Sequence, residues 1–123
     1  MAAPSPTEVL RTLVVSDLVA STALMERLGD VRAAEVFARH DRVARDLLRA
    51  HEGLEIDHAD GFLLLFRRPI SALRFALDYH RALVELNDEL GVQLRARVGV
   101  HLGEVVLRRN SPEDVERGAK PLE

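Results

Sequence analysis

Runs of apolar residues recur along the chain with strand-like spacing. Residues 11–16 are β-branched and apolar on both faces, which predicts a buried central strand that ends at Asp17. Residues 54–58 alternate between apolar and polar, and residues 62–66 are apolar throughout. Only Ala59-Asp60-Gly61 separates these two runs, so the pattern predicts a hairpin with Asp60 in its turn.

Helical periodicity fills most of the remaining chain. A short helix is predicted from Ala20 to Leu28, and a longer one from an N-cap at Asp30 to about Ala50. A third helix begins at Pro69 and ends at Gly91, and it keeps on one side Ile70, Leu73, Leu77, His80 and Val84. A last strand is predicted over residues 92–106, with one apolar and one polar face.

This order of elements predicts an α+β fold. It corresponds to the ferredoxin-like βαββαβ sandwich with a doubled first crossover, in which helices cover one face of a mainly antiparallel sheet. We expect residues 1–9 to be a flexible leader and residues 10–106 the domain core. Residues 107–123 lack periodicity, so we expect an irregular tail that leads to a missing C-terminal part.

Composition narrows the class of protein. The 123 residues are 47% hydrophobic and 30% charged, which suits one globular domain. A net charge of −3 with interspersed signs makes nucleic acid an unexpected partner. The chain has no cysteine and no secretory signal pattern, and its longest bulky apolar run, residues 62–66, is far too short to cross a membrane. We therefore expect a cytoplasmic location.

Two aspartates are candidates for metal binding. Asp17 at a strand end and Asp60 in a hairpin turn would converge if their strands are neighbours, and converging carboxylates are what two-metal phosphoryl chemistry needs. Asp17 could instead cap the following helix, and Asp60-Gly61 is also a common turn pair. The segment Leu18-Val19-Ala20-Ser21-Thr22 leads into that helix, so its backbone N–H groups and two hydroxyls form a candidate phosphate site.

Four motifs, in order, resemble the bacterial class III adenylyl and guanylyl cyclase catalytic domain over about residues 10–106. Residues 14–22, VVSDLVAST, are similar to the family's first metal motif. Leu28-Gly29-Asp30 falls where members often carry the same residues. Asp60-Gly61-Phe62 resembles the second metal motif, and residues 97–105, RVGVHLGEV, resemble the family's Arg-x-Gly-x-His-x-Gly-Glu strand.

The resemblance implies a site and a reaction. Two Mg²⁺ or Mn²⁺ ions would be held by Asp17, Asp60 and the backbone carbonyl of Leu18, and the phosphates would lie on residues 19–22, namely Val19, Ala20, Ser21 and Thr22. The ribose 3′-oxygen of ATP, or less favourably GTP, would attack the α-phosphorus and release pyrophosphate. The enzyme would act in signal transduction as a homodimer, with Arg97, Gly99 and His101 near the dimer cleft.

Departures from the family pattern support an alternative to an active cyclase. The lysine that ATP-using members carry before the second aspartate is absent, and Asp57 and His58 are the candidate base-recognition residues in its place. Asp57 could instead be a surface residue of its strand, which is the interpretation we favour. Ala59 replaces a glycine, and residues 107–123 contain no Asn/Arg helix motif to stabilise the transition state. The alternative is a degenerate nucleotide-sensing or dimerisation module of a larger regulatory protein, and we expect the 123-residue chain alone to be inactive. His40 and His80 are predicted to be boundary residues.

Overall fold

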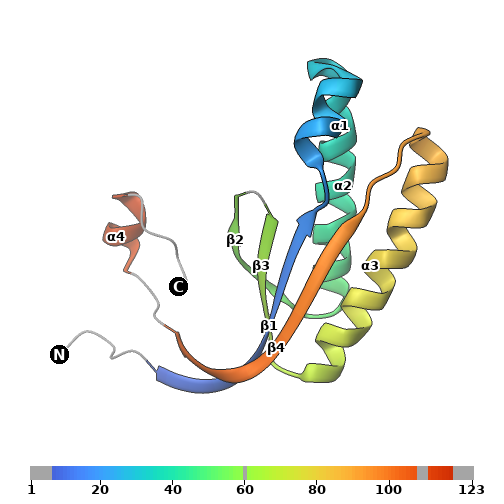
Figure 1. The fold of residues 1–123 in the computed structure, drawn as a ribbon. Helices are drawn as coiled ribbons and strands as arrows, with labels where there is room; N and C mark the ends of the chain where they lie inside the picture. The colour runs from blue at the N-terminus through green and yellow to red at the C-terminus, as the bar shows by residue number, and fades with distance from the viewer. Residues whose placement is uncertain (1–6, 60, 108–110, 118–123) are drawn as a thin grey trace.

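A computed structural model describes residues 7–59, 61–107 and 111–117 of the chain. Eight elements follow one another in this part of the chain, with bounds β1 Thr7–Leu18, α1 Ser21–Leu28, α2 Asp30–Ala50, β2 Leu54–His58, β3 Gly61–Phe66, α3 Pro69–Leu90, β4 Ala96–Leu107 and α4 Pro112–Glu116. The strands form one antiparallel sheet in the order β2-β3-β1-β4. This is the predicted ferredoxin-like α+β arrangement (Figure 1).

The boundaries differ from the predicted ones at a few places. β1 starts at Thr7, so residues 7–9 belong to the sheet, whereas residues 1–6 lie outside the described residues. Gly29 rather than Asp30 is the N-cap of α2, because Asp30 is already helical. Gly29 has a positive φ of 80°, which glycine adopts without strain. The segment after β4 was expected to be irregular, but it contains the short helix α4.

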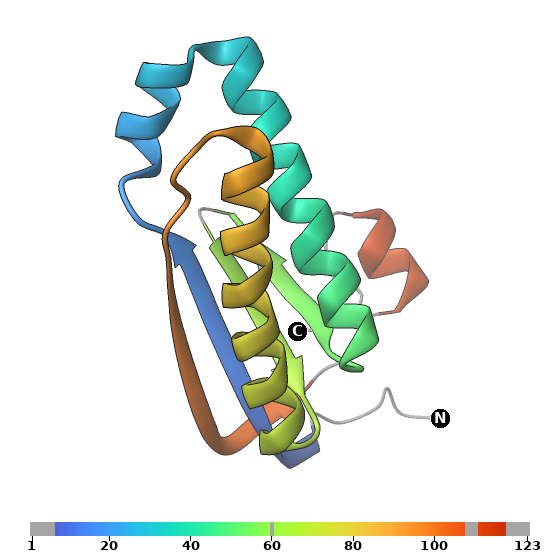
Figure 2. The ribbon, with the colours of Figure 1, turned by 90° about the vertical axis from the view of Figure 1, so that its right-hand side faces the viewer.

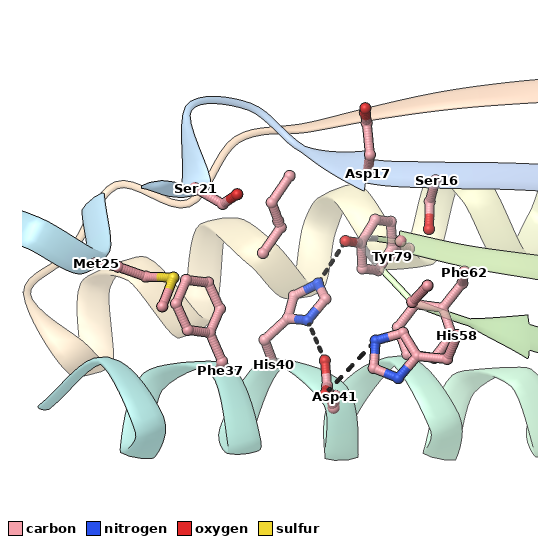
Figure 3. Close-up of a pocket in the computed structure, with 13 residues that line it drawn as sticks. Ser16, Asp17, Ser21, Met25, Phe37, His40, Asp41, His58, Phe62 and Tyr79 are labelled. Atoms are coloured by element: carbon pink, nitrogen blue, oxygen red, sulfur yellow. Dashed lines mark hydrogen bonds and ion pairs between the residues drawn. The ribbon is translucent and has the colours of Figure 1, made fainter. Parts of the chain in front are cut away.

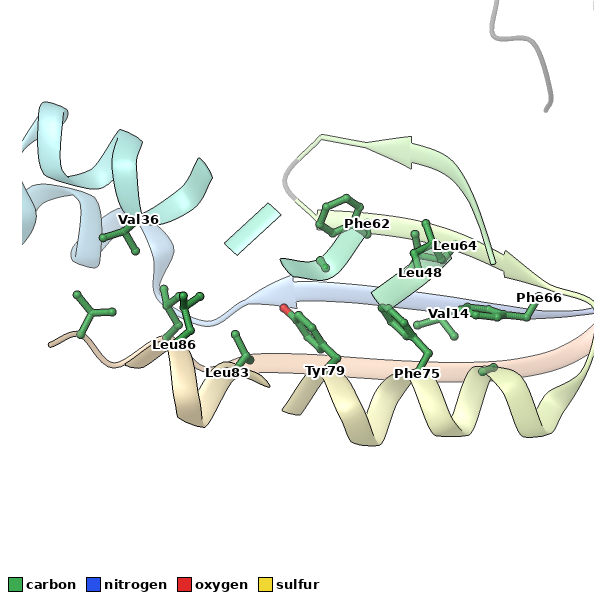
Figure 4. Packing of buried hydrophobic residues seen from close by; sticks show 14 of the residues in the cluster. Val14, Val36, Leu48, Phe62, Leu64, Phe66, Phe75, Tyr79, Leu83 and Leu86 are labelled. Atoms are coloured by element: carbon green, nitrogen blue, oxygen red, sulfur yellow. The ribbon is translucent and has the colours of Figure 1, made fainter. Parts of the chain in front are cut away.

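Helices α2 and α3 cover one face of the sheet (Figures 1 and 2). Their buried residues meet the inward side chains of β1 and β3, and Figure 4 shows this core with Val14 and Phe62 from the strands and Val36 and Phe75 from the helices. The β1 residues Thr12, Val14 and Ser16 face this core, so the intervening Leu13, Val15 and Asp17 face the other side. We call that other side the open face.

One buried residue was predicted to lie at the boundary. His40 is only 4% exposed and packs inside the helix layer, whereas His80 is exposed. The reason is visible in α2, whose buried residues are Ala33, Val36, His40, Ala44 and Leu48. His40 lies four residues after Val36 and four before Ala44, so it is on the same buried side of the helix. Its position on the helix, rather than its residue type, therefore determines its burial.

Candidate functional site

Asp17 lies near the C-terminal end of β1, between two neighbouring strands. Its Cα partner on β3 is Gly61 and its partner on β4 is Arg97. Arg97 Nε lies 3.5 Å from Asp17 Oδ1, and the Asp17 side chain is 50% exposed. A half-exposed carboxylate at a strand end, with one ion-pair partner, is accessible to a further cation.

Asp60 lies outside the described residues, but its two neighbours are placed. The Ala59 N–H donates to the Gly61 carbonyl at 3.1 Å, which closes the hairpin turn. A side chain at Gly61 would collide with the backbone carbonyl of Ser16, so glycine permits the close approach of this turn to β1. The residue that follows Asp60, Gly61, therefore lies directly opposite Asp17, because β3 and β1 are neighbours in the sheet.

The segment predicted to bind phosphate leads from β1 into α1. The Val19 N–H donates to the Arg95 carbonyl at 2.7 Å, so this amide is already used within the fold. Ala20 adopts the left-handed conformation, with φ 53°, and α1 begins at Ser21 without a side-chain cap. The amides of the first helical turn, from Ser21 onward, are the backbone donors that this segment offers to an anion.

A cavity of about 250 Å³ lies between this segment, α2 and the sheet (Figure 3). It is lined by Ser16, Asp17, Leu18, Ser21, Met25, Phe37, His40, Asp41, His58, Ala59, Gly61, Phe62 and Tyr79. In Figure 3 the Ser16 side chain points toward the cavity, whereas the Asp17 carboxyl group points away from it. The aspartate thus reaches the open face, while the cavity lies on the helix side of the sheet.

A hydrogen-bonded chain crosses the inner wall of this cavity. His40 Nε2 lies 2.6 Å from the Tyr79 hydroxyl, and His40 Nδ1 lies 2.9 Å from Asp41 Oδ1. An ionised Asp41 accepts from Nδ1–H, which leaves Nε2 to accept from the Tyr79 O–H. Burial lowers the pKa of His40, although Asp41 opposes this shift, and burial also raises the pKa of Tyr79. Both rings are therefore neutral near pH 7.

His58 occupies the outer wall of the cavity. Its ring stacks on Phe62 with centroids 4.1 Å apart, and Arg45 Nη2 lies 3.2 Å from its Nδ1. Its Nε2 is 3.8 Å from Asp41 Oδ2. This side chain, one of the two candidate base-recognition residues, is thus packed on the helix side.

Asp57 has a different environment from His58. It is paired with Leu63, whereas His58 is paired with Phe62, and successive strand residues point to opposite faces. The Asp57 carboxylate accepts a hydrogen bond from the His58 backbone N–H at 3.0 Å. The structure therefore does not bring the two candidate base-recognition side chains together.

The three residues predicted near a dimer cleft share the open face with Asp17. In the β1–β4 register Arg97 is opposite Asp17, Gly99 is opposite Val15, and His101 is opposite Leu13. All three are exposed. The open face thus carries the side chain of one candidate metal ligand and the predicted cleft residues.

Three polar residues that line the cavity, His40, Asp41 and Tyr79, were not predicted to belong to a functional site. These residues belong to no motif in the sequence, and the buried helical stripe was the only signal available for His40.

Within the described ranges no group of three or more His, Cys, Asp or Glu side chains is arranged to hold a metal ion. No helix of the described part is long and apolar enough to span a membrane.

Several solved structures with a similar fold are adenylyl or guanylyl cyclases. No protein-family model matches the sequence, and no curated protein matches it. The guanylyl cyclase Cya2 superimposes with a TM-score of 0.78 at 25% identity, covering 88% of this chain and 61% of that chain. The adenylyl cyclase CyaB from P. aeruginosa superimposes with a TM-score of 0.80 at 13% identity, covering 90% of this chain and 64% of that one.

A bacterial light-regulated adenylyl cyclase gives a TM-score of 0.79 at 20% identity, over 88% of this chain and 34% of that chain. This chain thus spans less than two thirds of the cyclase chains that it matches. The predicted resemblance is confirmed at the level of architecture: this chain has the fold of the class III adenylyl and guanylyl cyclase catalytic domain over most of its length.

Proposed function

We propose that this chain carries the metal-binding part of a nucleotidyl cyclase domain. The reaction is conversion of ATP, or less favourably GTP, to a 3′,5′-cyclic nucleotide and pyrophosphate in cytoplasmic signal transduction. The observation that carries the proposal is the register of β1 and β3, which sets Asp17 directly opposite Gly61 and hence beside the turn that contains Asp60. The cyclase fold of the similar structures supports it.

The residues at this position fit Mg²⁺ or Mn²⁺. Asp17, Asp60 and the Leu18 carbonyl are hard oxygen donors, and such ions bind through one or two carboxylates together with substrate phosphates. Gly61 permits the close backbone approach that brings the turn to Asp17. The chemistry that two bound ions supply is activation of the ribose 3′-hydroxyl and neutralisation of the phosphates.

The chain's own residues then bind and orient the substrate. Arg97 Nε lies 3.5 Å from Asp17 Oδ1, so Arg97 helps to orient this carboxylate on the open face. The α1 backbone N–H groups from Ser21 onward donate hydrogen bonds to the phosphates, aided by the positive end of the helix. Because Asp17 and the predicted cleft residues share the open face, we propose that a homodimer forms across it.

The second candidate function is a cyclase-like module without turnover, which senses nucleotide or mediates dimerisation. The observation that favours it is the position of His58, which is stacked on Phe62 and hydrogen-bonded by Arg45 on the helix side of the sheet. A side chain held in this way does not replace the missing lysine.

Metal affinity tests the proposal independently of turnover. Asp17→Asn keeps the side-chain shape but removes its charge, so Mn²⁺ should bind about tenfold more weakly, as measured by calorimetry. Asp60→Asn should have the same effect, and Asp30→Asn, at an exposed position on α2, is the matched control. Equal Mn²⁺ affinity in the wild type and both site variants contradicts the metal site.

Turnover separates the two candidate functions. The natural protein, at the length its gene encodes, is incubated with ATP or GTP and Mn²⁺, and cyclic nucleotide is measured. Product that disappears in Asp17→Asn supports the cyclase, whereas retained nucleotide binding without product supports the sensing module. Residues 1–123 alone should give no product, because they lack the transition-state motif, and measurable product from them would refute this account.

A further inference from the structure

Helix α3 exposes an apolar stripe from Ile70 to Val84. Ile70, Leu73, Leu77 and Val84 are 48%, 49%, 59% and 62% exposed. The buried side of the helix consists of other residues, Ala72, Phe75, Tyr79, Leu83 and Leu86. The sequence pattern correctly placed the first set on one side of the helix, but that side faces solvent.

The spacing of this stripe is that of a coiled-coil seam. Steps of three and four residues lead from Ile70 through Leu73, Leu77 and His80 to Val84, which is a heptad a/d pattern over more than two repeats. Such a seam accepts the side chains of a second helix that lies nearly parallel to the first. A helix with this pattern therefore has the surface to pack against another helix.

The neighbouring edge strand extends the exposed apolar area. α3 packs against β4 and runs beside it in both ribbon views (Figures 1 and 2). Val100 and Leu102, on the helix side of β4, are 42% and 52% exposed. We call these two residues, together with the α3 stripe, the α3–β4 surface. An apolar area of this extent on two adjoining elements is typical of an interaction site.

The charges beside the seam indicate the kind of helix that would bind. Arg74 and Arg81 follow Leu73 and His80 at the flanking e positions, and both are exposed. The acidic Asp78 is on the α2 side, where it pairs with His51 at 2.8 Å and with Arg81 at 3.3 Å. An exposed pair such as Asp78–Arg81 is weak, so the flank of the seam is basic between Leu73 and Val84. The next e position, Asp88, is acidic but lies one turn beyond Val84.

This basic flank disfavours a second copy of the chain as occupant. In an antiparallel pair of α3 helices, flanking e positions face one another, so arginines would be brought together. Glutamates at the corresponding positions of a different helix would instead form ion pairs with Arg74 and Arg81. Complementarity therefore selects an apolar seam with an acidic flank.

We propose that the α3–β4 surface is a docking site for an amphipathic helix of a partner protein, with apolar a and d positions and acidic flanking positions. The helix packs along α3 and against Val100 and Leu102. This interaction uses no residue of the metal site, so it stands or falls independently of cyclase activity.

Two synthetic peptides of three heptads test the proposal. Both carry Ile and Leu at a and d, one has Glu and the other Lys at the flanking positions, and binding to the whole chain is measured by fluorescence anisotropy. The Glu peptide should bind about tenfold more tightly than the Lys peptide. Leu77→Glu should lower its affinity about tenfold, whereas Val31→Glu, at an apolar position on α2 that is 77% exposed, should leave it unchanged.

A charge reversal tests specificity. The double variant Arg74→Glu and Arg81→Glu should prefer the Lys peptide, with the helical content checked by circular dichroism. Equal binding of both peptides, or of neither, overturns the proposal. Self-association that Leu77→Glu abolishes overturns it in favour of a second copy, and binding to anionic vesicles without peptide binding overturns it in favour of a lipid surface.

Discussion

His40 shows how position overrides residue type at the scale of a single residue. An imidazole between Asp41 and the Tyr79 hydroxyl has both ring nitrogens in hydrogen bonds, so its burial leaves no polar atom of the ring without a partner. The groups that face it are Asp41 on its own helix, Tyr79 on α3 and His58 on β2. The neutral ring is therefore part of the folded core rather than a free acid–base group.

Replacement of His40 should change how stability depends on pH. Burial lowers its pKa below the ordinary 6.5, so the unfolded chain takes up this proton more readily than the folded chain. The stability of the wild type should be full above that pH and decline as the pH falls through 6.5 towards the lowered pKa. In His40→Gln the thermal midpoint should depend less on pH across this interval.

A second variant controls for the hydrogen bond itself. Tyr79→Phe leaves His40 Nε2 without its partner, so it should lower the free energy of unfolding by about 1–3 kcal/mol at neutral pH. If His40→Gln has the same pH slope as the wild type between about pH 5 and 7, the buried histidine does not carry this dependence.

At the scale of elements, the connection between α3 and β4 shows how one side chain stabilises a segment that has no regular secondary structure. α3 ends at Leu90, with Gly91 in the left-handed conformation at φ 66°. The Asn87 side chain then donates to the Leu94 carbonyl at 3.0 Å and accepts from the Leu94 N–H at 2.8 Å. This pair of bonds satisfies a backbone that forms no strand until Ala96, while Val92 and Leu94 are buried.

Loss of this side chain should destabilise the fold. In Asn87→Ala both hydrogen bonds to Leu94 are lost, so the free energy of unfolding should fall by about 1–3 kcal/mol in urea denaturation. Asn87→Asp keeps only the acceptor and should fall between the alanine variant and the wild type. Equal stability of all three proteins would show that water replaces the side chain without cost.

At the scale of the whole molecule, the two faces of the sheet have different roles. α2 and α3 bury one face, and the other carries Asp17, Arg97 and His101 beside Val15, which is 55% exposed. The sequence resemblance associated this face with a dimer cleft, and the homodimer remains a proposal. The α3–β4 surface lies on the helix side, so the two proposed interactions do not overlap.

The homodimer can be tested on the open face. Val15→Asp places a charge opposite Gly99, so it should weaken self-association about tenfold in sedimentation measurements. Its stability should change by only about 0.5 kcal/mol, because the side chain is exposed. Val31→Asp and Leu77→Asp should leave self-association unchanged. A chain that stays monomeric at all concentrations contradicts the homodimer.

Local patterns in the sequence determined the three longer helices, the approximate strands, the β2–β3 hairpin and the place of Asp17 near a strand end. These features depend on neighbours in the chain, through strand alternation, helical period and turn residues, so they could be read without the fold. The cyclase-like motifs could be recognised for the same reason, since each lies within a few consecutive residues.

Only the tertiary structure decided which side of each element is buried and which residues meet. The stripe of Leu73 and Leu77 and the stripe of Phe75 and Tyr79 are both apolar, and packing against the sheet buries only the second. His40 joins Tyr79 across 39 positions of sequence, a contact that no local pattern contains. The sheet register likewise sets Asp17 opposite Gly61. Hydrogen bonding between strands that are distant in the sequence, rather than spacing along the chain, determines which residues face each other.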